Sequence, residues 1–262
     1  MNLDLTNKTA LVCGASQGLG LASAKELALL GANIIAASRN EEKLKTAVEQ
    51  LDTSKGQKHS YLVIDLSEPE AVREIVSSFL AEGIIIHVLI NNAGGPPSAP
   101  MIDTDAAEIE KAFRTHVISS HLLAQLVVAG MKKAGFGRIV NIVSTSVKQP
   151  INGLGISNLV RAAVANWAKT LANEISSSGI TINNVLPGFT NTDRLHYLFS
   201  KQASDRGLTE EDILTMTVSA IPAKRIGEPE ELGAAVAFLC SPAAAYINGI
   251  NLPVDGGRTG SL

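Results

Sequence analysis

Short apolar runs alternate with segments of helical periodicity along the whole chain. The runs at 33–37 and 84–90 are apolar on both faces, which is typical of strands covered by helices on either side. Seven such runs are predicted to be strands, at residues 9–13, 33–37, 61–66, 84–90, 138–143, 180–186 and 250–254.

About six helices are expected between these strands, at 19–30, 41–51, 68–82, 104–131, 155–177 and after 229. Asn40 is a predicted N-cap followed by two acidic residues, and Ser67 with Glu70 has the spacing of a capping box. Residues 187–224 are polar and irregular in pattern. Strict alternation of strand and helix predicts a doubly wound α/β fold with a parallel sheet, and without linkers or repeats we expect residues 1–262 to form a single domain.

Composition excludes several classes of function. The chain has 262 residues, 45% of them hydrophobic and 18% charged, with a net charge of −3. Without a basic cluster or an apolar run of about 18 residues, we expect neither nucleic acid nor a membrane as partner. Cys13 and Cys240 are expected to be buried free thiols, and no metal-binding spacing is present. The amino terminus resembles the approach to a first strand rather than a signal peptide, so a cytoplasmic protein is expected.

A glycine-rich turn connects the first strand to the first helix. Glycine allows a tight turn, and it lets the backbone approach a pyrophosphate at the positive end of a helix. The alternative is a tight strand–helix connection without a ligand. The predicted phosphate-binding residues are Gly14, Ser16, Gln17, Gly18, Leu19 and Gly20.

Further motifs follow the later strands. Asn91-Asn92-Ala93-Gly94 follows the fourth strand, and Pro187-Gly188 with Thr192 follows the sixth. Together with the GxxxGxG turn and the terminal Val254-Asp255-Gly256-Gly257, they make the chain resemble the short-chain dehydrogenase/reductase family along nearly its whole length. The resemblance implies a Rossmann-type fold that binds NAD(P)(H), with a substrate lid over about 189–223.

The resemblance also implies individual cofactor contacts. Asp65 and Leu66 would flank the adenine, and Asn91, Ala93 and Gly94 would line the adenine ribose and the pyrophosphate. Pro187 and Gly188 would lie beside the nicotinamide, and Thr192 near its carboxamide.

The end of the second strand indicates which dinucleotide is preferred. An NAD site needs a carboxylate there for the ribose 2′-hydroxyl, whereas an NADP site offers an arginine to the 2′-phosphate. Ser38-Arg39-Asn40 contains no acid, which favours NADP(H) over NAD(H). The alternative is that Arg39 is a solvated loop residue.

The catalytic positions depart from the pattern of this family. Ser144, at the end of the fifth strand, matches the family's serine. Thirteen residues later the family's YxxxK motif is replaced by Ser157 and Arg161, and His116 stands at the position of the family's asparagine. Ser157 can donate a hydrogen bond but is a far weaker acid than a phenol, and Arg161 keeps the positive charge and could bind the nicotinamide ribose.

Several alternatives remain for proton transfer. His116 titrates near neutrality and could transfer a proton, or it could fill the space of the asparagine. Tyr197, in the lid, is a less favoured donor. Enoyl-thioester reductases of the same superfamily carry serine at the tyrosine position, so Ser144, Ser157 and His116 could polarise a thioester carbonyl.

The sequence therefore favours an NADP(H)-dependent oxidoreductase with an altered proton relay, acting on a carbonyl or enoyl-thioester-like substrate. The alternatives are a nucleotide-binding protein with little or no redox turnover, acting as a sensor or inactive partner, and a non-redox lyase or dehydratase. Leu195, Tyr197, Leu198 and Phe199 in the lid indicate a small-molecule substrate that is partly apolar, although they could equally form a plain hydrophobic cover. Small residues beside Leu159 and Trp167, in a helix that the family pairs between subunits, predict a homotetramer.

Overall fold

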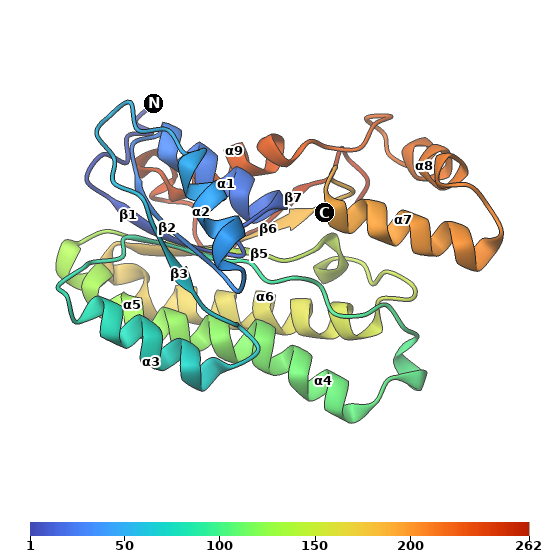
Figure 1. The fold of residues 1–262 in the computed structure, drawn as a ribbon, viewed down its shortest axis with the longest axis horizontal. Coiled ribbons are helices and arrows are strands. Elements are labelled where there is room, and N and C mark those ends of the chain that lie inside the picture. Colours follow the sequence, from blue (N-terminus) through green and yellow to red (C-terminus); the bar gives the residue numbers. More distant parts are fainter. Residues whose placement is uncertain (262) are drawn as a thin grey trace.

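Seven parallel strands form one twisted sheet in the computed structural model, which describes residues 1–261. Their order is β3-β2-β1-β4-β5-β6-β7, so the chain starts in the middle of the sheet and winds outward in both directions (Figure 1). The strands are β1 (Thr9–Cys13), β2 (Asn33–Ser38), β3 (Ser60–Val63), β4 (Val88–Asn91), β5 (Gly137–Ile142), β6 (Ile180–Pro187) and β7 (Asn251–Val254). The doubly wound α/β prediction is confirmed.

Helices cover both faces of this sheet (Figure 1). One face carries α1 (Gly18–Leu29), α2 (Glu41–Glu49) and α9 (Pro229–Cys240). The other carries α3 (Pro69–Leu80), α5 (Ser119–Ala134) and α6 (Gly155–Ile175), with α4 (Ala106–Phe113) leading into α5. The apolar strands therefore lie between two hydrophobic cores, one on each face. No helix within residues 1–261 has both the length and the apolar character required to cross a bilayer.

Two strands are shorter than their apolar runs, because a strand extends only where a neighbour can pair with it. β3 ends at Val63, which pairs with Ser38, the last residue of β2. Asp65 and Leu66 consequently lie in the turn that follows, rather than in the strand. β4 begins at Val88, four residues later than predicted, where β1 offers Ala10 as its partner.

The predicted capping box of Ser67 and Glu70 does not form. Asp65 accepts hydrogen bonds from both the backbone N–H and the hydroxyl of Ser67, at 2.9 and 2.8 Å. Helix α3 begins at Pro69 instead, with Glu68 as an N-cap that makes no side-chain capping bond. The short Asp65–Ser67 turn competes successfully for the serine hydroxyl.

Residues 193–206 and 210–219 are helical, although their polar and irregular pattern predicted irregular structure. Thr192 caps α7 (Asp193–Arg206), and Thr209 with Asp212 forms a capping box at the start of α8 (Glu210–Ser219). The two helices lie beyond the edge of the sheet (Figure 1). Leu195 and Phe199 are buried against Ile213 of α8, so these two lid residues form a small core of their own and do not indicate an apolar substrate.

A ladder of four asparagines crosses the sheet in register. Asn91 donates to Asn141, Asn141 donates to Asn184, and Asn184 donates to Asn251, each through the side-chain amide at 2.8 Å. The four residues pair directly across β4, β5, β6 and β7. Because a buried amide without partners is costly, this ladder links the four strands specifically in this register.

We predict that Asn141→Ala lowers the free energy of unfolding by about 2–5 kcal/mol, because it leaves the amide N–H of Asn91 and the amide oxygen of Asn184 without partners in the interior. Urea denaturation followed by circular dichroism measures this loss. Asn173→Ala, at an exposed position of α6, is the matched control and should change stability by less than about 0.5 kcal/mol. Equal losses in the two variants would contradict a structural role for the ladder.

Candidate active site

The glycine-rich turn after β1 is held in close contact with the loop after β4. Gly14 has φ +63°, and a Cβ there would lie 2.5 Å from Nδ2 of Asn92. A Cβ on Gly20 would lie 2.2 Å from the carbonyl oxygen of Gly14. Asn92 in turn donates to the carbonyl of Cys13 at 3.3 Å. Side chains at these two glycines would force α1 away from the sheet, so the tight turn is a steric requirement of the fold.

The N-terminus of α1 is open to a ligand. Its N-cap, Gln17, makes no side-chain capping bond, and its first turn contains no acidic residue. By contrast, Asn40 caps α2, whose first turn contains two glutamates. A Cβ on Gly18, which has φ +57°, would point toward Thr192 at 3.7 Å, into the space between this turn and the lid. Uncapped N–H groups at the positive end of a helix dipole suit a pyrophosphate.

The end of β2 carries positive charge. The Ser38 hydroxyl is buried without a hydrogen-bond partner in the described chain. The Arg39 side chain is 76% exposed, and its guanidinium is 3.9 Å from the Asp65 carboxylate. Such a long and exposed ion pair is weak, so Arg39 is available to a ligand.

Lys43 supplies a second cation that the sequence analysis missed. It lies in the first turn of α2, and its ammonium donates to the side-chain oxygen of Gln17 at 2.6 Å, bringing the charge to the glycine-rich turn. Its position four residues beyond Arg39, in the first turn of the predicted helix, could have indicated a second cation near the end of β2. Gln17 thus contributes by holding Lys43.

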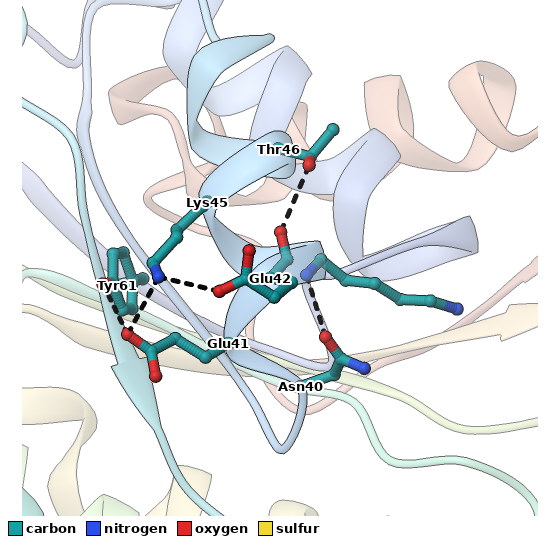
Figure 2. A network of polar contacts seen from close by, with 7 residues as sticks. Asn40, Glu41, Glu42, Lys45, Thr46 and Tyr61 are labelled. Carbon is teal, nitrogen blue, oxygen red and sulfur yellow. Dashed lines mark hydrogen bonds and ion pairs between the residues drawn. The ribbon is translucent and has the colours of Figure 1, made fainter.

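The acidic residues next to Lys43 are paired elsewhere (Figure 2). Lys45 bonds to Glu42 at 2.8 Å and lies 3.4 Å from Glu41. Glu41 also accepts a hydrogen bond from the Tyr61 hydroxyl at 3.0 Å, and that bond, followed by Lys45, lowers the pKa of the Glu41 carboxyl. Their carboxylates therefore repel an anion at the end of β2 less than their number suggests.

Ser144 and Ser157 lie after the carboxyl end of β5 and in the first turn of α6, respectively. Ser144 follows β5, and its hydroxyl oxygen accepts a hydrogen bond from the backbone N–H of Ser146 at 3.0 Å, which leaves its O–H free to donate. Ser157 lies in the first turn of α6 and is partly exposed. The carboxyl end of β6 lies next in the sheet, bringing Pro187 and Gly188 to the same edge.

Arg161 is buried at this edge, one turn after Ser157. Its guanidinium donates to the carbonyl of Ile142 at 2.9 Å and to the carbonyl of Ala93 at 3.2 Å, which ties α6 to the ends of β5 and β4. No carboxylate within residues 1–261 forms an ion pair with it. Burial, followed by the charge of Arg194, lowers the Arg161 pKa to about 10, so the group stays cationic at neutral pH.

His116 is buried in a π-helical turn (Arg114–Ile118) between α4 and α5, a distortion often found at functional sites. Burial, followed by the charge of Arg161, lowers the His116 pKa to about 2, while a hydrogen bond to the backbone of Gly94 acts in the opposite direction. The imidazole is therefore neutral at physiological pH and contacts the predicted cofactor loop. At neutral pH the His116 imidazole carries no second proton, so it cannot act as a general acid.

His116 and Arg161 share a small cavity with Asn91. Its volume of about 10 Å³ is close to that of one water probe. Oδ1 of Asn91, at the end of the asparagine ladder, and Nε of Arg161 are both buried without partners in the described chain. An acceptor and a donor facing one small cavity suit a bridging water.

The remaining candidates lie around this edge. Thr192 caps α7 and faces the glycine-rich turn. Tyr197 is 58% exposed, and its ring lies 5.5 Å from the Arg194 guanidinium rather than in a buried site. No cluster of metal-binding side chains occurs in the part of the chain that the structure describes. The arrangement can bind a dinucleotide phosphate and can polarise an oxygen atom near Ser144.

Comparisons with known proteins agree with this geometry. The family model described as enoyl-(acyl carrier protein) reductase matches residues 14–259. The 3-oxoacyl-(acyl-carrier-protein) reductase of Vibrio cholerae is 34% identical over 258 residues, covering 97% of this chain and 98% of that protein. The gluconate 5-dehydrogenase of Gluconobacter oxydans is 33% identical over 258 residues, covering 98% and 97%. The L-sorbose reductase of Gluconobacter frateurii, solved with NADPH and L-sorbose, superposes with a TM-score of 0.93 at 30% identity over the full length of both chains.

The low pKa of His116 predicts a loss of stability in acid. The unfolded histidine takes up a proton below its ordinary pKa of 6.5, while the folded one stays neutral down to about 2. The contribution of the neutral His116 to the free energy of unfolding is therefore fully present above pH 6.5, and it falls by about 1.4 kcal/mol per pH unit below that value. Between pH 7.5 and 5, His116→Asn should lose about 2 kcal/mol less unfolding free energy than the wild type.

Urea titrations at the two pH values measure this difference. His196→Asn, which replaces an exposed histidine of α7, is the matched control and should keep the pH dependence of the wild type. If the His116→Asn variant and the wild type lost stability in parallel, His116 would be titrating normally in the folded protein.

Proposed function

Because this chain belongs to the short-chain dehydrogenase/reductase family, we propose that it is an NADP(H)-dependent oxidoreductase that reduces a carbonyl or enoyl-thioester-like substrate with an altered proton relay. The observation that carries this proposal is the combination of an open phosphate-binding turn with a buried cation, Arg161, beside Ser144 and Ser157. The similar proteins are named as reductases or dehydrogenases, which supports redox turnover over binding alone.

The residues present fit NADP(H). The turn Gly14–Gly20 and the uncapped start of α1 would hold the pyrophosphate, and Arg39 with Lys43 would bind the 2′-phosphate. The Ser38 hydroxyl, buried without a partner, stands where an NAD-specific protein needs a carboxylate. The complex of L-sorbose reductase with NADPH supports the same preference.

NADPH bound here would supply a hydride to the substrate. The protein's contribution is to polarise the oxygen that gains negative charge. Ser144 is prepared as a donor, because its oxygen already accepts a bond from Ser146. Ser157 offers a second hydroxyl, and Arg161 supplies a fixed positive charge below them. Preorganised donors and charge of this kind stabilise a developing oxyanion.

The proton for that oxygen comes from solvent in this proposal. Ser157 is too weak an acid to take over from a tyrosine, and His116 is neutral with a pKa of about 2. This favours the view that His116 positions the Gly94 loop and shapes the small cavity beside Arg161. An enoyl thioester accepts the hydride at its conjugated β-carbon, and the resulting enolate then takes a proton from solvent at its α-carbon. The protein needs only to polarise the thioester carbonyl in this reaction, so such a substrate fits these residues as well as a ketone does.

The predicted homotetramer remains a prediction. In α6, Leu159 is 42% exposed and Ala162 is exposed beside it, which leaves this face available to a second chain. Trp167, by contrast, packs inward and donates to His121 at 3.2 Å.

For cofactor preference, we predict that Arg39→Ser with Lys43→Gln weakens NADPH binding about tenfold to hundredfold and leaves NADH binding within about twofold, because in this proposal the two cations pair with the 2′-phosphate, which NADH lacks. Fluorescence titration of the reduced cofactors measures both affinities. Lys58→Gln removes an exposed lysine away from the glycine-rich turn and is the control. An equal loss for NADH would show that the two residues act on the fold.

For catalysis, Ser144→Ala should lower kcat about 100- to 1000-fold on whichever ketone or enoyl thioester the wild type reduces, with NADPH affinity unchanged. Absorbance at 340 nm over a substrate panel gives the rates. If the wild type binds NADPH yet oxidises it with none of these substrates, the protein is a nucleotide-binding sensor or inactive partner instead. Ser157→Tyr with Arg161→Lys restores the family's motif and should raise ketone reduction relative to the wild type.

A further inference from the structure

A second, larger cavity adjoins the candidate active site. Its volume is about 520 Å³, enough for a small metabolite. Thr145, which lines it, directly follows Ser144, and Phe189, on its other side, directly follows Gly188. The cavity therefore extends from the predicted reacting position outward, toward the lid helix α7 and the segment after β7. Its polar and charged lining includes Thr145, Gln149, Asn152, Gln202, Arg258 and Thr259.

Arg258 carries the single charge among the described residues that line this cavity. Its guanidinium lies over the Phe189 ring, 4.8 Å from the ring centroid. No acceptor or carboxylate within residues 1–261 hydrogen-bonds or pairs with that guanidinium. This cation–π contact restrains the position of the guanidinium and leaves its N–H donors unused, which suits a planar, two-oxygen anion.

The nearest acid along the chain is occupied elsewhere. The Asp255 carboxylate accepts hydrogen bonds from the backbone N–H groups of Gly257 at 2.9 Å and Thr259 at 2.8 Å. It folds the segment that bears Arg258 into a turn instead of neutralising the guanidinium. The charge is therefore held in position by the fold and remains without a counterion in the described structure.

The other polar lining groups are neutral and also unused. The side-chain amides of Gln149, Asn152 and Gln202 make no hydrogen bond within the described chain. One positive charge surrounded by neutral amides matches a ligand with one negative charge. A phosphate dianion would keep a net negative charge in the cavity, so a carboxylate is the better match.

We propose that the substrate is an oxo acid whose carboxylate binds Arg258, which makes Arg258 a specificity-determining residue. This inference rests on the proposed reductase function for its reacting group. The carboxylate lies in the outer cavity, bonded to Arg258 and the neighbouring amides, and this anchors the carbonyl end at Ser144. Arg258 is partly buried in the cavity wall, and an Arg–carboxylate pair is bidentate and directional, so it orients the substrate as well as attracting it.

The test uses the purified full-length protein with NADPH and three pairs of probes: 3-oxobutanoate, 4-oxopentanoate and 5-oxohexanoate, each with its methyl ester. The wild type should reduce at least one acid with a kcat/KM at least tenfold above that of its ester. Arg258→Gln should lower kcat/KM for that acid about tenfold to hundredfold, mainly through KM, and change the ester less than threefold. Arg258→Lys should recover part of the loss.

Two controls separate folding from recognition. Arg206→Gln removes an exposed arginine at the end of α7 that does not line the cavity, and it should keep the wild-type values. NADPH affinity should be the same in Arg258→Gln and the wild type. Preference for the esters, or an equal loss on acid and ester in Arg258→Gln, would overturn the proposal while leaving the reductase function intact.

A binding measurement covers the case in which no probe is reduced. Calorimetric titration of the NADPH-loaded protein with hexanoate, which has one carboxylate and no reducible carbonyl, should give binding that Arg258→Gln loses. That result with no turnover would contradict the reductase function and keep the anion site. Absence of hexanoate binding to the wild type would overturn the anion site, as would tighter binding of inorganic phosphate than of hexanoate.

Discussion

All seven strands are parallel, so all of their carboxyl ends meet at one edge of the sheet, and the candidate site is built along that edge. The asparagine ladder fixes the register of β4 to β7 beneath it, because a slip would leave buried amides unpaired. Arg161 then joins α6 to the ends of β4 and β5 through two backbone carbonyls. The positions of the phosphate turn, the serines and the lid all follow from this shared edge.

The electrostatics of the edge follow from the same constraint. Burial, followed by the charge of Arg161, keeps His116 neutral. Arg161 itself is buried without a carboxylate partner in the described chain, which makes the site favourable for negative charge. Farther out, Arg39 and Lys43 stand at the end of β2 while the neighbouring glutamates pair with Lys45 and Tyr61. Cations thus stand at both the proposed 2′-phosphate site and the proposed reacting oxygen, which suits an anionic dinucleotide and an oxyanion.

In the proposed active site, the side chains keep part of the family's chemistry. If Arg161 stands at the position of the family's lysine, as we propose, it keeps a cation there, but its guanidinium donates to the carbonyls of Ile142 and Ala93, so its charge acts from a fixed place. Ser157 preserves a hydroxyl without the acidity of a phenol. Binding and polarisation therefore remain available to these side chains, whereas rapid proton delivery does not. A reaction that depends on polarisation more than on proton transfer is the one this arrangement favours.

From the sequence alone, the alternating fold and the glycine-rich turn could be predicted, because both depend on local periodicity and on residue type. The helices α7 and α8 were not predicted, although Thr192 and Thr209 are residues of a type that commonly caps the start of a helix. The contact of Lys43 with Gln17 and that of Arg258 with Phe189 are set in the tertiary structure, because they join segments that are far apart in the chain. The pKa of His116 was decided there too, because burial and the distance to another charge arise when distant segments pack together.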